Sequence, residues 1–266
     1  MRRLLIRPGG IGDTTLSLPA MEFLKSDYTE VWVRADAVPL IRFADRVRAI
    51  SSTRIDLLGL PDVEPPAALV ETLRSFDSII SWYGASQPEF REAMHSLELH
   101  VQFLSALPGA GSGLHAADFF LQQVCGNGPA VPRLDFGPAV RENFAAIHPF
   151  SGSPRKNWPL DRFRELAARL PMPVRWTAGP DEHLDGATRF CDLGDLAQWL
   201  ATARVYVGND SGVTHLAAAV GVPVVAIFGP TDPAVWAPRG DRVRVIHGPL
   251  DAITVDRVLS VVDWLR

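Results

Sequence analysis

The chain has 266 residues, of which 47% are apolar and 21% are charged, and its formal net charge is −4. This length suits one large domain or two modest ones, and the apolar fraction is enough to bury a core, which excludes a disordered chain. Residues 1–140 carry 12 Lys and Arg against 16 Asp and Glu, and residues 141–266 carry 14 against 14. Neither half has the positive excess of a general nucleic-acid binder, so we expect no nucleic-acid partner.

The N-terminus and the cysteines indicate the compartment. The basic start is followed by an apolar run of only residues 4–6, too short for a signal peptide, and no stretch approaches the roughly 20 apolar residues that span a bilayer. Cys125 and Cys191 have no metal-ligand spacing and fit a reducing compartment. We therefore expect a soluble, cytoplasmic protein. Two interpretations fit a group of six arginines: peripheral contact with the cytoplasmic face of the inner membrane, or ordinary surface charge. They are Arg2, Arg3, Arg7, Arg42, Arg46 and Arg48.

The first half alternates short apolar runs with amphipathic stretches. The predicted strands are 4–6, 31–33 and 78–82, and the predicted helices are 14–25, 67–75 and 115–124. Pro19 either kinks the first helix or lies in its first turn. The Gly- and Pro-rich segment 126–138 is the predicted linker.

The second half repeats this alternation. The predicted strands are 144–148, 173–178, 205–207, 223–228 and 242–247, and the predicted helices are 161–170, 196–202, 212–220 and 254–265. Asp161 is the predicted N-cap of its helix, and Arg169 lies near the end that favours positive charge. The pattern predicts an α/β fold with two Rossmann-like parallel-sheet domains, 1–138 and 139–266, facing each other across a cleft.

The segment VYVGNDSGVTHLAAAVGVPVVAIFGPTDPAVW, 205–236, carries the strongest chemical signal. A strand feeds a turn that opens a helix, and free N–H groups at a helix start favour an anion such as phosphate. Gly212 permits close backbone approach, and Ser211, Thr214 and His215 supply donors for phosphate oxygens. The alternative is that Asp210 and Ser211 only cap the helix. The segment lacks the GxGxxG and GxxxxGK[ST] patterns, which argues against NAD and against a triphosphate bound in a P-loop.

Two further loops follow predicted strands in the second half. IHPFSGSPRKNWPLDRF, 147–163, combines hydroxyls, a glycine and two cations, and Lys156 is suited to neutralise charge on a leaving phosphate. A solvated charge pair is the alternative. FGPTDPAVWAPRG follows a buried strand and is either part of a ligand cleft or a simple turn.

The segment RPGGIGDTTLSLPA follows the first strand of the first half. Its glycine spacing fits neither standard phosphate-binding pattern. Asp13 is the residue of interest, because it is expected to face the cleft from the first domain. The local alternative is that Asp13 is only an N-cap.

Three segments together carry a resemblance to a known family: IRPGGIGDTTLSLPAMEFLK, HPFSGSPRKNWPLDRFRELAARL and GNDSGVTHLAAAVGVPVVAIFGPTDPAVWAPRG. They resemble glycosyltransferase family 9, the ADP-heptose:lipopolysaccharide heptosyltransferases. The resemblance covers most of residues 1–25 and nearly all of 144–240, and it is weak over 26–140. It implies a GT-B fold, an inverting mechanism, an ADP-sugar donor (ADP-heptose) and a lipopolysaccharide-core or lipid-linked saccharide acceptor. Lys156 and the helix start at 211–215 can replace a metal ion at the leaving diphosphate, so we expect that no metal and no other cofactor is required.

The resemblance also assigns roles to individual residues. Asp13 takes the place of the general base, and Lys156 the place of the lysine beside the donor phosphates. Glu182, with Asp181 as the alternative, takes the place of the acidic residue at the nucleoside ribose. The remaining substrate-binding residues are Gly12, Thr14, Ser151, Gly152, Asp210, Ser211, Gly212 and His215. The chain departs from the family in its short first domain and in its glycine-rich first loop.

Two other functions fit the same sequence. The shortened first domain is compatible with a non-catalytic nucleotide-sugar-binding protein that kept only the donor half. A sugar-nucleotide epimerase on the same fold would need no acceptor.

Overall fold

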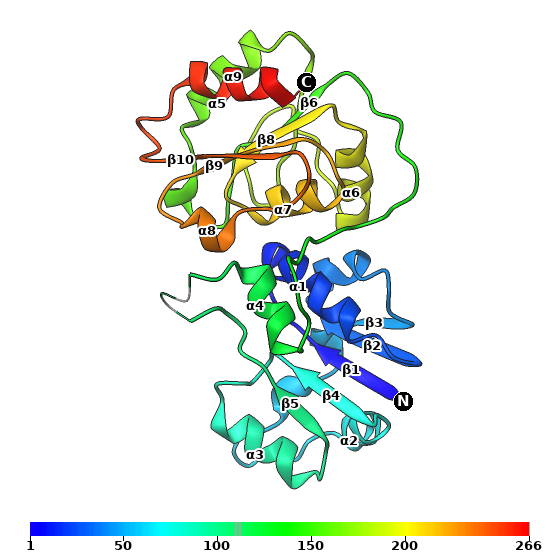
Figure 1. Ribbon diagram of the computed structural model, residues 1–266. Coiled ribbons are helices and arrows are strands. Elements are labelled where there is room, and N and C mark those ends of the chain that lie inside the picture. The colour runs from blue at the N-terminus through cyan, green and yellow to red at the C-terminus, as the bar shows by residue number, and fades with distance from the viewer. Residues whose placement is uncertain (110, 112, 266) are drawn as a thin grey trace.

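The computed structural model describes residues 1–109, 111 and 113–265 and folds them into two lobes, one above the other in Figure 1. Each lobe is built on a five-stranded, all-parallel sheet with helices on its faces. The strand order is β3-β2-β1-β4-β5 in the first lobe and β10-β9-β8-β6-β7 in the second. The predicted α/β architecture of two parallel-sheet domains is confirmed.

The first lobe contains five strands and four α-helices among its described residues. The strands are β1 (Arg2–Ile6), β2 (Tyr28–Val33), β3 (Arg46–Ala49), β4 (Ser78–Ser81) and β5 (Val101–Phe103). The helices are α1 (Ile11–Phe23), α2 (Ala67–Arg74), α3 (Pro88–Ser96) and α4 (Ala116–Gln123).

The second lobe contains the remaining elements. Its strands are β6 (Ala145–His148), β7 (Val174–Trp176), β8 (Val205–Asn209), β9 (Val224–Phe228) and β10 (Val243–His247). Its helices are α5 (Leu160–Arg169), α6 (Leu193–Thr202), α7 (Gly212–Ala219), α8 (Pro233–Trp236) and α9 (Val255–Leu265).

Central strands of both sheets are apolar on both faces because helices cover both. In β1, Leu5 packs into the core beneath α1 and α4, whereas Leu4 and Ile6 point to the opposite face and pack with residues of α2 and α3. Successive side chains of a strand alternate between faces, so a run of apolar residues serves two cores at once. In β8, Tyr206 and Val207 divide between two cores in the same way.

Short elements with little apolar content did not emerge from the sequence. The edge strands β3 and β5 contain no fully buried residue, and α3 buries only Phe90 and Met94.

The structure corrects one predicted helix start and decides the position of one proline. Pro159, not Asp161, is the N-cap of α5, so Asp161 lies in the first turn, where it pairs with Arg164. Pro19 lies inside α1 and not in its first turn.

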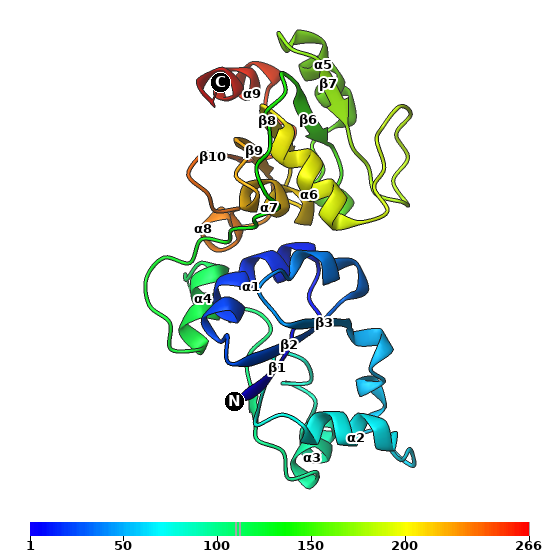
Figure 2. The ribbon, with the colours of Figure 1, turned by 90° about the vertical axis from the view of Figure 1, so that its right-hand side faces the viewer.

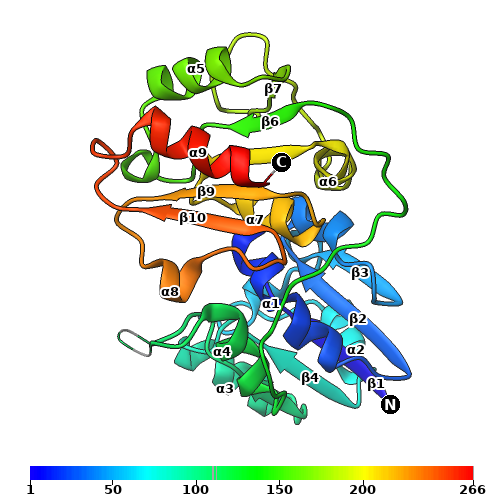
Figure 3. The ribbon, with the colours of Figure 1, turned by 45° about the horizontal axis from the view of Figure 1, so that its top comes forward.

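The lobes are joined by the segment between α4 and β6, which contains no helix or strand. The domain boundary predicted at residue 138 falls in this segment and stays a prediction. One apolar core continues from α1 and α4 of the first lobe into α7 of the second. Figures 2 and 3 both show α1 lying against α7 at the junction. The lobes therefore meet through packed helices as well as through the chain.

Within the described part of the chain, no helix combines the length and apolar character that a membrane span requires.

Candidate active site between the two lobes

A cavity of about 540 Å³ lies at the junction of the two lobes. It is lined by the beginning of α1 and by segments that directly follow β2, β6, β8 and β9. These are carboxyl ends of parallel strands, where open α/β sheets bind ligands. The lining residues are Gly10, Ile11, Gly12, Asp13, Leu16, Arg34, Gly152, Ser153, Lys156, Asp210, Ser211, Gly212, His215, Thr231 and Trp236.

The N-termini of α1 and α7 meet at this cavity through two glycines. A Cβ atom added to Gly212 would lie 2.7 Å from Ile11 Cβ and 3.0 Å from the Gly12 backbone nitrogen. A Cβ added to Gly12 would lie 3.1 Å from the His215 ring. Larger residues would force the two helices apart. Because the first N–H groups of a helix have no partner inside it, two sets of such donors open onto one cavity and favour an anionic ligand.

Asp13 contributes both to the helix start and to the cavity. It is the third residue of α1, whose N-cap is Gly10, and its Oδ2 accepts a hydrogen bond from the Gly10 N–H at 3.1 Å. Asp13 is therefore not the N-cap residue, although it does satisfy one N–H at the helix start. The same side chain lines the cavity from the first lobe.

Arg7 lies beneath the start of α1 and is only 3% exposed. The interpretations that place it on the protein surface or against a membrane are therefore wrong. Its Nε donates to Ser17 Oγ at 3.2 Å, and its Nη2 donates to the Ala106 carbonyl oxygen at 3.3 Å. Burial lowers the pKa of Arg7 to about 10, while the negative charge of Asp13 acts in the opposite direction. The guanidinium remains protonated at neutral pH and supplies a buried positive charge next to Asp13.

Lys156 and Asp210 form an ion pair on the opposite wall. The Lys156 Nζ atom lies 2.7 Å from Asp210 Oδ2, and Asp210 is almost completely buried. The contact brings the charges together without a well-aligned hydrogen bond, and Oδ2 has no hydrogen-bond partner in the described part of the protein. A single carboxylate thus holds the lysine at the cavity while leaving further N–H donors of its ammonium available to a ligand.

Asn209 fixes the loops that carry this pair. It is fully buried at the end of β8, and its Nδ2 donates to the Pro149 carbonyl oxygen at 2.7 Å. Its Oδ1 accepts the Trp158 N–H at 2.9 Å. The amide therefore ties the start of the 149–158 loop, and its end, to the strand that precedes α7.

Ser211 caps α7 at the cavity edge. Its Oγ accepts a hydrogen bond from the Thr214 N–H at 3.4 Å and lies 3.1 Å from Thr214 Oγ1. Thr214 Oγ1 in turn donates to the Asn209 carbonyl oxygen at 2.5 Å. The capping interpretation of Ser211 is correct, and the same residue lines the cavity.

His215 is a buried, uncharged group between the lobes. Burial lowers its pKa to about 4, opposed by the negative charges of Asp210 and Asp13 and assisted by the positive charge of Lys156. The imidazole is therefore neutral at pH 7 and has one N–H to donate.

Most of the predicted site residues lie together at this cavity. They are Gly12, Asp13, Gly152, Lys156, Asp210, Ser211, Gly212 and His215. Thr14 does not reach the cavity, because it is fully buried and its hydroxyl donates to the Gly9 carbonyl oxygen at 3.3 Å. Ser151 is also outside the lining, and its hydroxyl bonds to Asn157 Oδ1 at 2.8 Å. Both hydroxyls bond to groups of their own loops here, and a substrate contact of either residue stays a prediction.

Glu182 also lies outside the cavity lining, after β7. Its Oε2 accepts the Gly179 N–H at 2.6 Å and lies 3.8 Å from His148 Nε2. His148 ends β6, which lies between β7 and β8 in the sheet. Glu182 therefore lies at the carboxyl ends of the strands, the same end of the sheet at which the cavity lies. A contact between Glu182 and a ribose stays a prediction.

The cavity also contains residues that the sequence did not single out. Arg34 directly follows β2 and lines the cavity. The sequence feature that could have identified it is a polar residue at the end of an apolar run. Thr231 and Trp236 come from the FGPTDPAVWAPRG loop, so the hypothesis that this loop lines a cleft is correct. The others are Gly10, Ile11 and Leu16, and Ser153 also lines the cavity as one of the hydroxyls of the predicted 147–163 loop.

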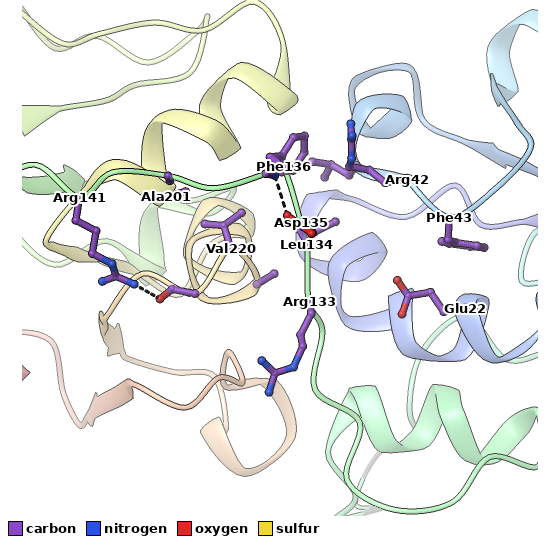
Figure 4. Close-up of a pocket in the computed structure, with 15 residues that line it drawn as sticks. Glu22, Arg42, Phe43, Arg133, Leu134, Asp135, Phe136, Arg141, Ala201 and Val220 are labelled. Atoms are coloured by element: carbon purple, nitrogen blue, oxygen red, sulfur yellow. Dashed lines mark hydrogen bonds between the residues drawn. The ribbon is translucent and has the colours of Figure 1, made fainter.

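A second groove, of about 640 Å³, lies on the linker side of the junction. Arg42, Arg133 and Arg141 line it, but Figure 4 shows their guanidinium groups pointing in different directions. Arg141 donates to the Gly221 carbonyl oxygen at 2.8 Å, and Arg133 lies 3.6 Å from Asp241. Because these groups do not converge, the cavity between α1 and α7 is the better candidate for chemistry.

Comparison with known proteins agrees with this fold. The profile of glycosyltransferase family 9 (heptosyltransferase) matches residues 124–258, just over half of the chain, and the protein belongs to this family. Lipopolysaccharide heptosyltransferase 3 of Escherichia coli (strain K12) is 31% identical over 126 residues, which cover 39% of this chain and 36% of that protein. The matches thus span only about a third of the curated relatives' length.

Solved structures extend the likeness in fold to both lobes. The glycosyltransferase family 9 protein from Veillonella parvula DSM 2008 superposes with a TM-score of 0.77 at 16% identity, covering 99% of this chain and 96% of that one. The E. coli ADP-heptose lps heptosyltransferase II superposes with a TM-score of 0.74 at 20% identity, covering 100% and 98%. At these identities the superpositions show a shared GT-B-like fold.

The glycine contact between α1 and α7 predicts the effect of a single methyl group. Gly212→Ala should lower the free energy of unfolding by about 1–3 kcal/mol, because its Cβ meets the Gly12 backbone and Ile11. Chemical denaturation measures the loss. Gly152→Ala is the matched control, since a Cβ there meets open space. Equal stability of the two variants would contradict the contact.

His215 predicts a dependence of stability on pH. Its folded pKa of about 4 is below the unfolded value, so protonation favours the unfolded chain as the pH falls from about 6.5 to 4. Over this range wild type should lose about 3 kcal/mol more than His215→Gln. Denaturation at pH 7 and pH 4 tests this, with the exposed His95→Gln expected to follow wild type. Parallel curves for wild type and His215→Gln would refute it.

Proposed function

We propose that this protein is an inverting glycosyltransferase that moves a sugar from a nucleotide-diphosphate donor to a saccharide acceptor. One observation carries the proposal. A carboxylate from the first lobe, Asp13, shares a cavity with a cation and a helix N-terminus from the second, Lys156 and the start of α7. Membership in glycosyltransferase family 9 supports it.

The second lobe provides what a diphosphate needs. The first N–H groups of α7, the hydroxyl of Ser211 and the ammonium of Lys156 all lie at the cavity. Together they are suited to bind the donor and to stabilise the charge that develops on the departing nucleotide. We propose ADP-heptose as the donor, because one solved relative is named an ADP-heptose lps heptosyltransferase. A lipopolysaccharide-core saccharide is the corresponding acceptor.

The first lobe provides the base. Asp13 would accept the proton of the acceptor hydroxyl as that oxygen attacks the anomeric carbon. An aspartate is a far weaker base than an alkoxide, so the proton moves late, as the new bond forms. The carbon–oxygen bond to the nucleotide diphosphate breaks on the opposite face, and the configuration inverts.

The neutral His215 completes the cavity between the two charged walls. As an uncharged donor beneath Gly12 and Gly212, it would hydrogen-bond to a sugar or phosphate oxygen without competing with Lys156 for negative charge. Closing the lobes around the donor would exclude water and so limit hydrolysis.

Replacing the proposed base tests the function. Asp13→Asn keeps an acceptor oxygen for the Gly10 N–H but removes the charge, so transfer from ADP-heptose to a lipopolysaccharide-core acceptor should fall at least about 100-fold. Binding of ADP-heptose should change little. Transfer is measured by chromatography of labelled product and binding by calorimetry. Asp161→Asn, an exposed first-turn aspartate of α5, is the matched control.

Each outcome has a distinct meaning. Wild-type turnover by Asp13→Asn would reject Asp13 as the base. Donor binding by the wild type without transfer to any saccharide would favour a nucleotide-sugar-binding protein. Conversion of the donor without an acceptor would favour an epimerase.

A further inference from the structure

A short segment of the second lobe is held by a helix of the first lobe. Arg239 donates from both Nη1 and Nη2 to the carboxylate of Asp118 on α4, each at 2.5 Å. The Nε2 atom of His115 lies 2.8 Å from the Ala237 carbonyl oxygen. His115 Nδ1 accepts the Ala117 N–H, so the ring proton is on Nε2, which donates to Ala237. We call His115, Asp118, Ala237 and Arg239 the α4–α8 clasp.

The clasp is stronger than an ordinary surface ion pair. The two charged side chains are only 23% and 17% exposed, and their contact is the two-pronged arrangement that favours Arg. Both side chains also bond to Ala130 in the connecting segment. Arg239 Nη1 donates to the Ala130 carbonyl oxygen at 3.0 Å, and the Ala130 N–H donates to Asp118 Oδ1 at 2.8 Å. Lobe, linker and opposite lobe are thus joined at one point.

The clasp lies next to the wall of the cavity in sequence and in space. Trp236, which lines the cavity, immediately precedes Ala237 and ends α8, a single turn capped by Asp232. Figures 1 and 2 show α8 directly facing α4 across the junction. A four-residue helix has little rigidity of its own, so its position depends on what anchors it. Here the anchor is on the other lobe.

We propose that the α4–α8 clasp positions Trp236 against the nucleotide-sugar donor, so that donor binding is coupled to contact between the lobes. This inference rests on the proposed function. The clasp residues are positioning residues, since none of them lines the cavity. If Trp236 contacts the donor only when the clasp is closed, the apparent dissociation constant rises as the closed fraction falls. Coupling is reciprocal, so bound donor in turn favours the closed clasp.

Removing one charge of the clasp tests the coupling. Asp118→Asn should weaken ADP binding at least about fivefold in calorimetry, although residue 118 does not line the cavity. Arg239→Lys, which loses the two-pronged geometry, should weaken it less and serves if Asp118→Asn fails to fold. Glu142→Gln is the matched control, because it breaks the Arg175–Glu142 pair, at 2.8 Å, which links the end of the connecting segment to β7 and not one lobe to the other. It should bind ADP as wild type does.

Trp236 separates positioning from mere stabilisation. In a Trp236→Ala background, Asp118→Asn should have no further effect on ADP affinity. A fivefold loss in that background, or a lower unfolding temperature with wild-type ADP affinity, would overturn the inference while leaving the proposed function intact. A wild-type protein that binds none of ADP, UDP, GDP and CDP would overturn both.

Discussion

The glycine-to-glycine contact between the N-termini of α1 and α7 is the constraint on which the site depends. Gly12 and Gly212 have no side chains, and only that lets two helices from different lobes begin at one cavity. Every other feature follows from this approach. It brings Asp13 opposite Lys156, and it presents two sets of unpaired N–H groups to the same volume. Neither lobe alone contains the complete set of groups.

The charged groups of the site lie in two sets on opposite walls of the cavity. Arg7 lies beneath Asp13 on one wall, and Asp210 holds Lys156 on the other. His215 lies between them and is neutral because it is buried. An incoming diphosphate would add negative charge on the side of Lys156 and the helix N-terminus, away from the carboxylate proposed as base. The two lobes therefore differ in the charge that they bring to the cavity as well as in the elements that line it.

The sequence predicted those parts of the site that are local. The strand–turn–helix at Gly212 could be located because its turn residues, cap and helix are contiguous, and the family resemblance then gave roles to Asp13 and Lys156. Positions set by tertiary packing could not be located. Trp236 reaches the cavity because another lobe anchors its segment, and Thr14 turns inward although it adjoins Asp13. The edge strands β3 and β5 of the first lobe were not predicted, because they bury too little apolar surface to leave a pattern in the sequence.

The most direct test is a crystal structure of the protein with ADP. The diphosphate should lie within hydrogen-bonding distance of the Gly212 and Val213 N–H groups, with Lys156 Nζ in contact with a phosphate oxygen. Asp13 should face the β-phosphate from the opposite lobe. ADP bound in the groove beside Arg42 and Arg133, with the start of α7 free of phosphate, would contradict the account.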